Sequence, residues 1–141
     1  MVDVGDKPAT RRRAVAEAIV TMGPETAAAF FGGDLPKGDA VAVVRVAAIQ
    51  GAKRTPELVP LCHPLSLTAI AVVIEPSDSG VRIEVAAETT GPTGVEMEAI
   101  TGAAIGAVTL YDMVKGIERG VTIGPVRLLK KSGGRSGTWQ R

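Results

Sequence analysis

The clearest pattern of apolar and polar positions lies in residues 81–88, where apolar side chains occupy every second position. A period of two is typical of a strand that has one buried face. Residues 66–75 are apolar on both faces, as expected of a strand that is covered on two sides. The turn-forming residues 76–80, with the sequence PSDSG, separate the two segments. We therefore predict an antiparallel hairpin over residues 66–88.

Helical spacing is clearest in residues 96–118, where apolar side chains recur at helical intervals until Gly120 ends the pattern. Residues 24–33 predict a short alanine-rich helix that begins with proline and ends with two glycines. Asp39 is a suitable N-cap for a further helix, which is predicted to reach about Arg54.

The remaining segments are shorter. Pro56, Pro60 and Pro64 exclude a continuing helix and predict a stiff loop. Residues 121–129 predict a last strand, and the glycine- and serine-rich residues that follow it predict a flexible basic loop over about residues 131–141.

Residues 14–22 fit either a helix or a strand, because Val15, Ile19 and Met22 have helical spacing while the β-branched run within this segment favours a strand. If the segment is a strand and the two short helices form one layer, the element order becomes β-α-β-β-α-β. That order is the ferredoxin-like one, an antiparallel sheet with helices packed on one face. We predict this α+β fold as a single domain over residues 1–141. The fold hosts many functions and identifies none of them.

The core is predicted to be poor in large side chains. Apolar residues make up 45% of the 141 residues, but aromatic residues only 3%. Small aliphatic side chains remove little surface from water, so we expect association of subunits to contribute to stability.

The charged residues almost balance, with 16 Lys and Arg against 15 Asp and Glu, which excludes a uniformly basic nucleic-acid binder and a strongly acidic solvating domain. The scarcity of aromatic side chains also argues against an RNA-binding module that stacks bases. The charges are unevenly placed, with basic residues gathered in residues 11–13 and 119–141 and most acids between them. Such basic ends are either solvated or help to bind an anionic ligand.

The single cysteine, Cys62, excludes an internal disulfide and a multi-cysteine metal site. Residues 1–13 lack the apolar core of a signal peptide. The longest uncharged apolar run, residues 58–74, contains two prolines and a histidine and is a poor membrane span. We therefore expect a cytoplasmic protein with no membrane and no nucleic-acid partner.

Cys62 and His63 stand side by side in the proline-bounded loop. No other histidine or cysteine exists to complete a metal site with them, so we expect no metal. Adjacent side chains in an extended backbone point apart, which argues against a Cys–His nucleophile pair. His63 is therefore either satisfied by backbone groups or forms a hydrogen bond to a ligand.

Two groups of charged residues lie on the helix predicted over residues 96–118. Glu96 and Glu98 stand in its first turn, where the helix dipole favours acids and where carboxylates could also accept hydrogen bonds from a base or a sugar. Asp112 and Lys115 are neighbours near its other end, either as a surface ion pair or as an acid/base lysine with a carboxylate partner.

These two groups are far apart within one chain. Glu96 and Asp112 are separated by 16 positions, which corresponds to roughly 24 Å along an unbroken helix. A small ligand could hardly touch both. Either one group alone is functional, or sites form between subunits. Residues 128–137 (LLKKSGGRSG) lack the spacing of a Walker phosphate loop, but their glycine amides, serines and cations could bind phosphate.

Several of these segments together resemble a known family. In order along the chain they are MVDV, KGD, AKRTPELVPLCHPL, TGVEMEA, LYDM-x-K, GPVRLL and KSGG-x-SG, within residues 1–137. This series is similar to the MoaC family of cyclic pyranopterin monophosphate synthases, which act in molybdenum cofactor biosynthesis. The resemblance implies a lyase that rearranges 3′,8-cyclo-7,8-dihydroguanosine 5′-triphosphate to the cyclic pyranopterin phosphate and releases pyrophosphate.

The resemblance also implies a ferredoxin-like fold, no metal or organic cofactor, and a homo-hexamer built as a trimer of dimers with active sites at the dimer interfaces. It implies roles for individual residues, although which lysine is the acid and which the base is left open. The catalytic residues would be Asp112, Lys115 and Lys37. The substrate-binding residues would be Leu61, Cys62, His63, Glu96, Met97, Glu98, Arg12 and Lys131. The alternative is a ferredoxin-like nucleotide-binding or regulatory module without turnover.

Overall fold

The computed structural model describes residues 1–33 and 35–141, and its centre is one antiparallel sheet. The strands follow the order β2-β3-β1-β4-β5. Their bounds are Thr10–Thr21 for β1, Leu67–Ser77 for β2, Gly80–Gly91 for β3, Thr122–Ser132 for β4 and Trp139–Gln140 for β5. The predicted hairpin is confirmed, with Ile74 opposite Ile83 and a tight turn between Ser77 and Gly80.

The ambiguous residues 14–22 belong to a strand. The sheet decides this, because β1 pairs with β3 along one edge and with β4 along the other. Residues 14–18 of β1 are buried without a break, as expected of a central strand, and Ala14, Ala16 and Ala18 are fully buried beneath the helices.

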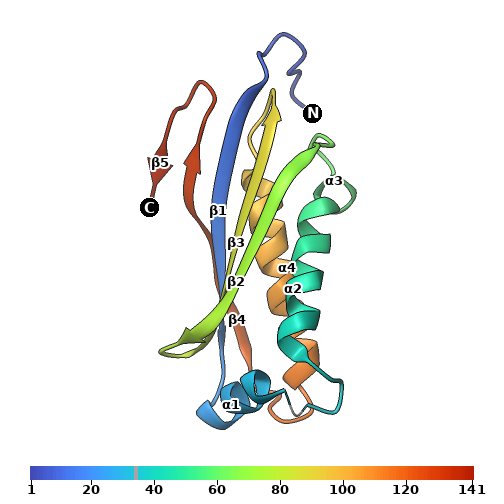
Figure 1. The fold of residues 1–141 in the computed structure, drawn as a ribbon, viewed down its shortest axis with the longest axis vertical. Helices are drawn as coiled ribbons and strands as arrows, with labels where there is room; N and C mark the ends of the chain where they lie inside the picture. Colours follow the sequence, from blue (N-terminus) through green and yellow to red (C-terminus); the bar gives the residue numbers. More distant parts are fainter. Residues whose placement is uncertain (34) are drawn as a thin grey trace.

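Within the described residues, four helices accompany the sheet: α1 (Pro24–Gly32), α2 (Ala40–Lys53), α3 (Thr55–Leu58) and α4 (Glu96–Val114). Figure 1 shows the long helices α2 and α4 side by side on the same face of the sheet. The predicted N-cap is confirmed, since the Asp39 side chain accepts a hydrogen bond of 3.0 Å from the backbone N–H of Ala42.

Three predicted bounds were wrong. Residues 55–58 form a turn of helix in place of an irregular loop, because Pro56 stands in the first turn, where a missing N–H costs nothing. Helix α4 ends at Val114 and not at residue 118. Residues 131–141 were predicted as a loop, but Lys131 belongs to β4 and lies opposite Trp139 of β5, so hairpin pairing continues close to the chain end.

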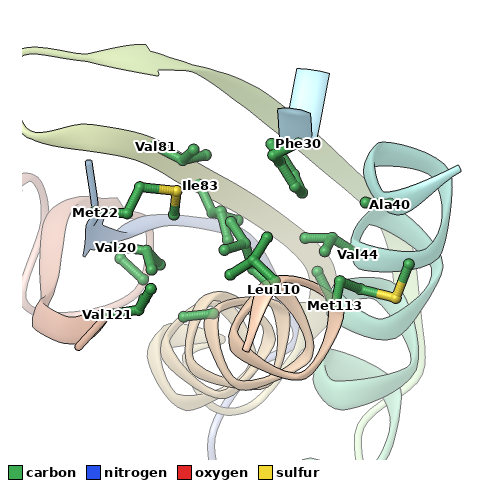
Figure 2. Packing of buried hydrophobic residues seen from close by; sticks show 14 of the residues in the cluster. Val20, Met22, Phe30, Ala40, Val44, Val81, Ile83, Leu110, Met113 and Val121 are labelled. Carbon is green, nitrogen blue, oxygen red and sulfur yellow. The ribbon is translucent and has the colours of Figure 1, made fainter. Parts of the chain in front are cut away.

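The core lies between the sheet and the two long helices. Figure 2 shows Phe30, Val44, Ile83 and Leu110 meeting there, and each of the four is buried. Small residues let the two helices approach closely, and a Cβ atom added at Gly51 of α2 would lie 2.8 Å from the Cβ of Ile105 on α4. The scarcity of aromatic side chains is thus matched by close backbone packing.

Among the helices of the described residues, α4 is the one that is long and apolar enough to cross a membrane, by length and composition alone. In this fold 56% of its most apolar 18-residue window is buried. Its apolar character is therefore explained by packing, since it covers the sheet and contacts α2.

On the opposite face of the sheet, a network of charged side chains surrounds Glu17, which is only 4% exposed. Arg82 Nε donates to Glu17 Oε2 over 2.6 Å, and Arg127 Nε donates to Oε1 over 2.8 Å. Burial alone would raise the pKa of Glu17, but the two guanidinium groups outweigh it and the pKa is lowered. Arg82 also forms ion pairs with Glu75 and Glu84.

Candidate active site

The predicted catalytic residues meet at the carboxyl-terminal end of α4, and we call Lys37, Asp112 and Lys115 the aspartate–lysine cluster. Lys37 Nζ donates to the carboxylate Oδ2 of Asp112 over 2.6 Å and to its backbone oxygen over 2.9 Å. Lys115 Nζ lies 2.7 Å from the other carboxylate oxygen, Oδ1. Both lysines therefore share one carboxylate, and each oxygen of that carboxylate has its own ammonium partner.

The backbone around this cluster explains how Lys37 arrives there. Lys37 lies in the connection between α1 and α2, between the buried Leu35 and Gly38. The backbone φ of Gly38 is +92°, a conformation that favours glycine and turns the chain into α2. On α4, Lys115 is the C-cap residue and keeps helical geometry, so it stands one turn from Asp112. Val114, between them, is fully buried and faces the core.

The electrostatics of the cluster define its protonation states. Hydrogen bonds from Lys115 and then Lys37 lower the pKa of Asp112 from 3.8 to about 2. The same contact raises the pKa of Lys115. Near neutral pH Asp112 is thus a carboxylate and Lys115 an ammonium, so Lys115 is a proton donor in the free protein. About half of the Asp112 side chain, 50%, is exposed.

Most of the predicted substrate-binding residues lie at the opposite end of α4, around a cavity of about 360 Å³ that we call the His63 pocket. Its lining includes Leu61, Cys62, His63, Met97 and Glu98, from the loop after α3 and from the first turn of α4. The hydrogen bond from Cys62 N–H to the carbonyl of Val59, 3.0 Å long, shapes that loop.

Two acidic groups in the His63 pocket have displaced pKa values. Glu98 is 3% exposed, and its burial raises the pKa of its carboxyl group. Burial, and then the nearby charge of Glu98, raise the pKa of the Cys62 thiol. The thiol therefore stays protonated near neutral pH, which fits a contact residue and not a thiolate nucleophile.

A smaller cavity of about 140 Å³ lies next to the His63 pocket, and we call it the Lys131 cleft. It is lined by Arg12, Glu96 and Lys131 together with residues of the glycine-rich segment, and Gly94 borders both cavities. Lys131 Nζ lies 2.9 Å from Glu96 Oε1. Arg12 is fixed by donating to the backbone carbonyls of Gly91, over 2.9 Å, and Pro92, over 3.0 Å.

Glycine is required where the chain passes over Arg12. Gly134 has a φ of +72°, and a Cβ atom there would lie 2.0 Å from Arg12 Nη1. The neighbouring Gly133 has a φ of +95°, and its Cβ atom would lie 2.2 Å from the carbonyl oxygen of Arg11. Three cationic side chains, two serine hydroxyls and a close backbone make this cleft suitable for an anion such as phosphate.

The structure thus divides the predicted site residues into two sets. Lys37, Asp112 and Lys115 lie at one end of α4, and the eight predicted substrate-binding residues lie around the two cavities at the other. The separation is roughly 24 Å along the unbroken helix. Among the described residues no three side chains of His, Cys, Asp or Glu come together as metal ligands do.

Several lining residues had not been singled out. Val2, Val4 and Lys7 close the His63 pocket from the chain start. Arg13 and Ser132, which line the Lys131 cleft, lie in the two segments that were expected to bind an anion. The signal of the chain start in the sequence was weak. The MVDV segment belonged to the matched series of motifs, but no spacing rule relates the first residues of a chain to a loop some sixty positions away.

Comparisons with known proteins identify the family of this chain. The model of the MoaC family matches residues 1–134. A cyclic pyranopterin monophosphate synthase from Pelotomaculum thermopropionicum is 53% identical over 143 residues, which cover 100% of this chain and 84% of the relative. The cyclic pyranopterin monophosphate synthases from Brucella ovis and Brucella melitensis are each 51% identical over 141 residues, covering 99% of this chain and 86% of each relative. The match includes both ends of α4 and both cavities, and the chain belongs to the MoaC family.

Proposed function

We propose that this chain is an enzyme of molybdenum cofactor biosynthesis with the activity of its relatives, cyclic pyranopterin monophosphate synthase. The substrate is 3′,8-cyclo-7,8-dihydroguanosine 5′-triphosphate, and pyrophosphate is released as the cyclic phosphate forms. The observation that carries the proposal is the clustering of the predicted site residues at the two ends of α4, in arrangements suited to proton transfer and to anion binding. Its setting is the cytoplasm.

The two cavities support a division of roles. Arg12 and Lys131 face the Lys131 cleft, where their charges would offset the negative charge of the triphosphate and of the departing pyrophosphate. His63 and Glu98 line the larger pocket, whose volume suits a fused-ring heterocycle. Glu98, with its raised pKa, can share a proton with ring nitrogens.

The aspartate–lysine cluster supports a role in proton transfer. Opening and reclosing the ring requires protons to be supplied to and removed from the reacting atoms. Lys115 has a raised pKa in the free protein and suits the donor role. Asp112 holds both ammonium groups in place and, with a pKa of about 2, remains ionised while it does so.

We further propose that the active site is composite, with one subunit supplying the aspartate–lysine cluster and its partner supplying the two cavities. The separation of the two sets along α4 supports this, since one small substrate cannot span it. An antiparallel packing of two copies about a two-fold axis would set the carboxyl-terminal end of one α4 beside the amino-terminal end of the other. The assembly is a hexamer, a trimer of such dimers.

Exposed apolar side chains on the helical layer support this face as the interface. Val46 of α2 is 54% exposed and Val108 of α4 is 55% exposed, and Val43 is exposed on the same helix as Val46. Valines placed so on a small chain are typical of surfaces that a second subunit covers. The sheet order β2-β3-β1-β4 and the helices on one face support the ferredoxin-like form of the α+β fold.

The direct test is pyrophosphate release by the purified protein in the presence of the cyclised substrate. We expect turnover by the wild type and by Asp78→Ala, a control that removes an exposed carboxylate in the β2–β3 turn. Asp112→Ala and Lys115→Ala should lose it. Substrate binding without turnover by the wild type would contradict the enzyme and support the nucleotide-binding module.

The composite site is tested by mixing two inactive variants, Asp112→Ala and His63→Ala, after dissociation and reassociation of the subunits. In a mixed dimer one of the two sites combines an intact Asp112 with an intact His63. Equal mixing should therefore restore about a quarter of wild-type activity, since half of the dimers are mixed and half of their sites are intact. Each variant alone is the control. No recovery in dimers shown to be mixed would place both residues of a site in one subunit.

A further inference from the structure

Glu118 connects two parts of the chain that both lead to the aspartate–lysine cluster. It lies three positions beyond Lys115, where its backbone N–H donates to the carbonyl of Val114 over 3.1 Å. Its side chain reaches the start of α1, where Oε2 accepts a hydrogen bond of 2.9 Å from Gly23 N–H and one of 2.6 Å from Thr26 Oγ1. Figure 1 shows α1 beside this end of α4.

Helix α1 has no cap of its own. Gly23 is its N-cap residue and has no side chain, and the helix has no capping hydrogen bond from a local side chain. The Glu118 carboxylate takes that place from a distant part of the sequence, at the end of the helix where the dipole favours negative charge. The hydrogen bonds from Thr26 and Gly23 lower the pKa of Glu118, so the carboxylate is the form that binds.

The position of α1 determines where Lys37 arrives. Only two of the nine residues of α1, Thr26 and Phe30, are buried, so the helix is held by little packing. It ends at Gly33 in the left-handed conformation, and the short connection that follows carries Lys37 to the carboxylate of Asp112. A shift of the first turn of α1 would therefore displace Lys37.

We infer that Glu118 is a positioning residue for the aspartate–lysine cluster: by capping α1 it fixes Lys37, and by anchoring the segment after α4 it fixes Lys115, so that both ammonium groups meet Asp112. This inference rests on the proposed function of the cluster. The Glu118 side chain completes a ring of contacts. The ring runs from Glu118 through α1 to Lys37, from Lys37 to Asp112, and along the end of α4 back to Glu118. Glu118 itself does not contact the reacting groups.

The test compares Glu118→Ala with Glu118→Gln. The glutamine amide oxygen can accept from both Gly23 and Thr26, whereas alanine can accept from neither. We expect kcat to fall roughly 10- to 100-fold in Glu118→Ala, because small displacements of catalytic groups cost that much, while KM changes little and Glu118→Gln recovers most of kcat. Glu25→Ala removes another acid from the first turn of α1 and is the matched control, with kcat unchanged.

A second readout separates positioning from mere stabilisation of the fold. Carbon NMR of the Asp112 carboxyl group reports its pKa, which is about 2 while both lysines contact it. In Glu118→Ala the pKa should rise toward its ordinary value of 3.8 as the contacts loosen, and in Glu118→Gln it should stay low. Thr26→Val, which keeps the bond from Gly23, should lie between the two and serves as the milder variant if alanine at residue 118 unfolds the chain.

Unchanged kcat and an unchanged Asp112 pKa in Glu118→Ala or Thr26→Val would overturn the inference. Failure of the proposed function looks different. Either the wild type would then bind the substrate without turnover, or Asp112→Ala would keep full activity, while the NMR titration would still show whether Glu118 positions the lysines. A fall in kcat that Glu118→Gln does not recover would assign the effect to the charge of Glu118 and would contradict positioning through its hydrogen bonds to Gly23 and Thr26.

Discussion

The close approach of α2 and α4 leads to a quantitative prediction for Gly51→Ala. The added Cβ atom would lie 2.8 Å from Ile105 Cβ and 2.9 Å from its Cγ1. Carbon atoms in contact are about 3.5–4.0 Å apart, so the helices must separate by roughly 0.7 Å or more. A change of rotamer cannot relieve this, because the Cβ of Ile105 moves only with the backbone of α4.

Two opposing free energies decide the result. Overpacking of a well-packed core costs about 1–3 kcal/mol, and a clash against a backbone-fixed atom belongs in the upper part of that range. Alanine in a helix interior gains about 1 kcal/mol over glycine. The net expectation is a loss of about 1–2 kcal/mol in the free energy of unfolding, obtained by subtracting the gain from a cost of about 2–3 kcal/mol.

Gly106→Ala is the matched control on α4. Its added Cβ atom would lie 3.3 Å from Ala48 Cβ and 3.4 Å from Ile83 Cγ2, a much milder contact. We expect its net effect to lie near zero. Urea unfolding followed by circular dichroism, at one protein concentration because association adds to stability, measures both variants. If Gly51→Ala proves as stable as Gly106→Ala, the close helix contact and the reasoning built on it are refuted.

Three further predictions concern charge and association. The pKa of Asp112 is about 2 in the folded protein and 3.8 when unfolded, so the stability that this carboxylate contributes is present above about pH 4 and is lost as the pH falls toward 2. Asp112→Asn should therefore remove this part of the acid-unfolding curve. Identical acid-unfolding curves for the variant and the wild type would contradict the prediction. Glu17→Ala leaves Arg82 and Arg127 without their shared buried acceptor and should lower the free energy of unfolding by about 1–3 kcal/mol in urea, whereas an unchanged midpoint would show that solvent replaces the carboxylate. Val108→Glu places a charge on the proposed interface and should dissociate the subunits in sedimentation with parallel loss of activity; full assembly of this variant would exclude that face.

Much of the fold could be predicted because its elements carry strong local patterns. The strict alternation of residues 81–88 and the helical spacing from residue 96 onward are visible in any short window. Residues 14–22 were ambiguous because their local pattern fits both a helix and a strand. Pairing on both edges of β1, which involves residues far along the chain, decides in favour of the strand.

The candidate site was predictable only where its contacts are local. Asp112 and Lys115 are three positions apart on a helix, so their contact follows from helical geometry. The bond from Lys37 to Asp112 spans 75 positions, and motif resemblance, not spacing, placed Lys37 among the catalytic residues. Glu118 lies outside the matched motifs, so its hydrogen bonds to α1 were not predicted. Glu17 was assigned to no role, because a charge on the outer face of a strand is normally solvated.

Helix α4 imposes a constraint on how this protein can evolve. One rigid segment carries functional groups at both of its ends, so its length is part of the active site. Inserting one residue near its middle would shift Asp112 by about 1.5 Å along the axis and rotate it by about 100° relative to Glu96. Exposed side chains outside the proposed interface and the functional groups can be exchanged one at a time, but insertions and deletions within the helix should be rejected. A screen of single-residue insertions along Glu96–Val114 would find the whole helix intolerant, including positions far from either set of functional groups.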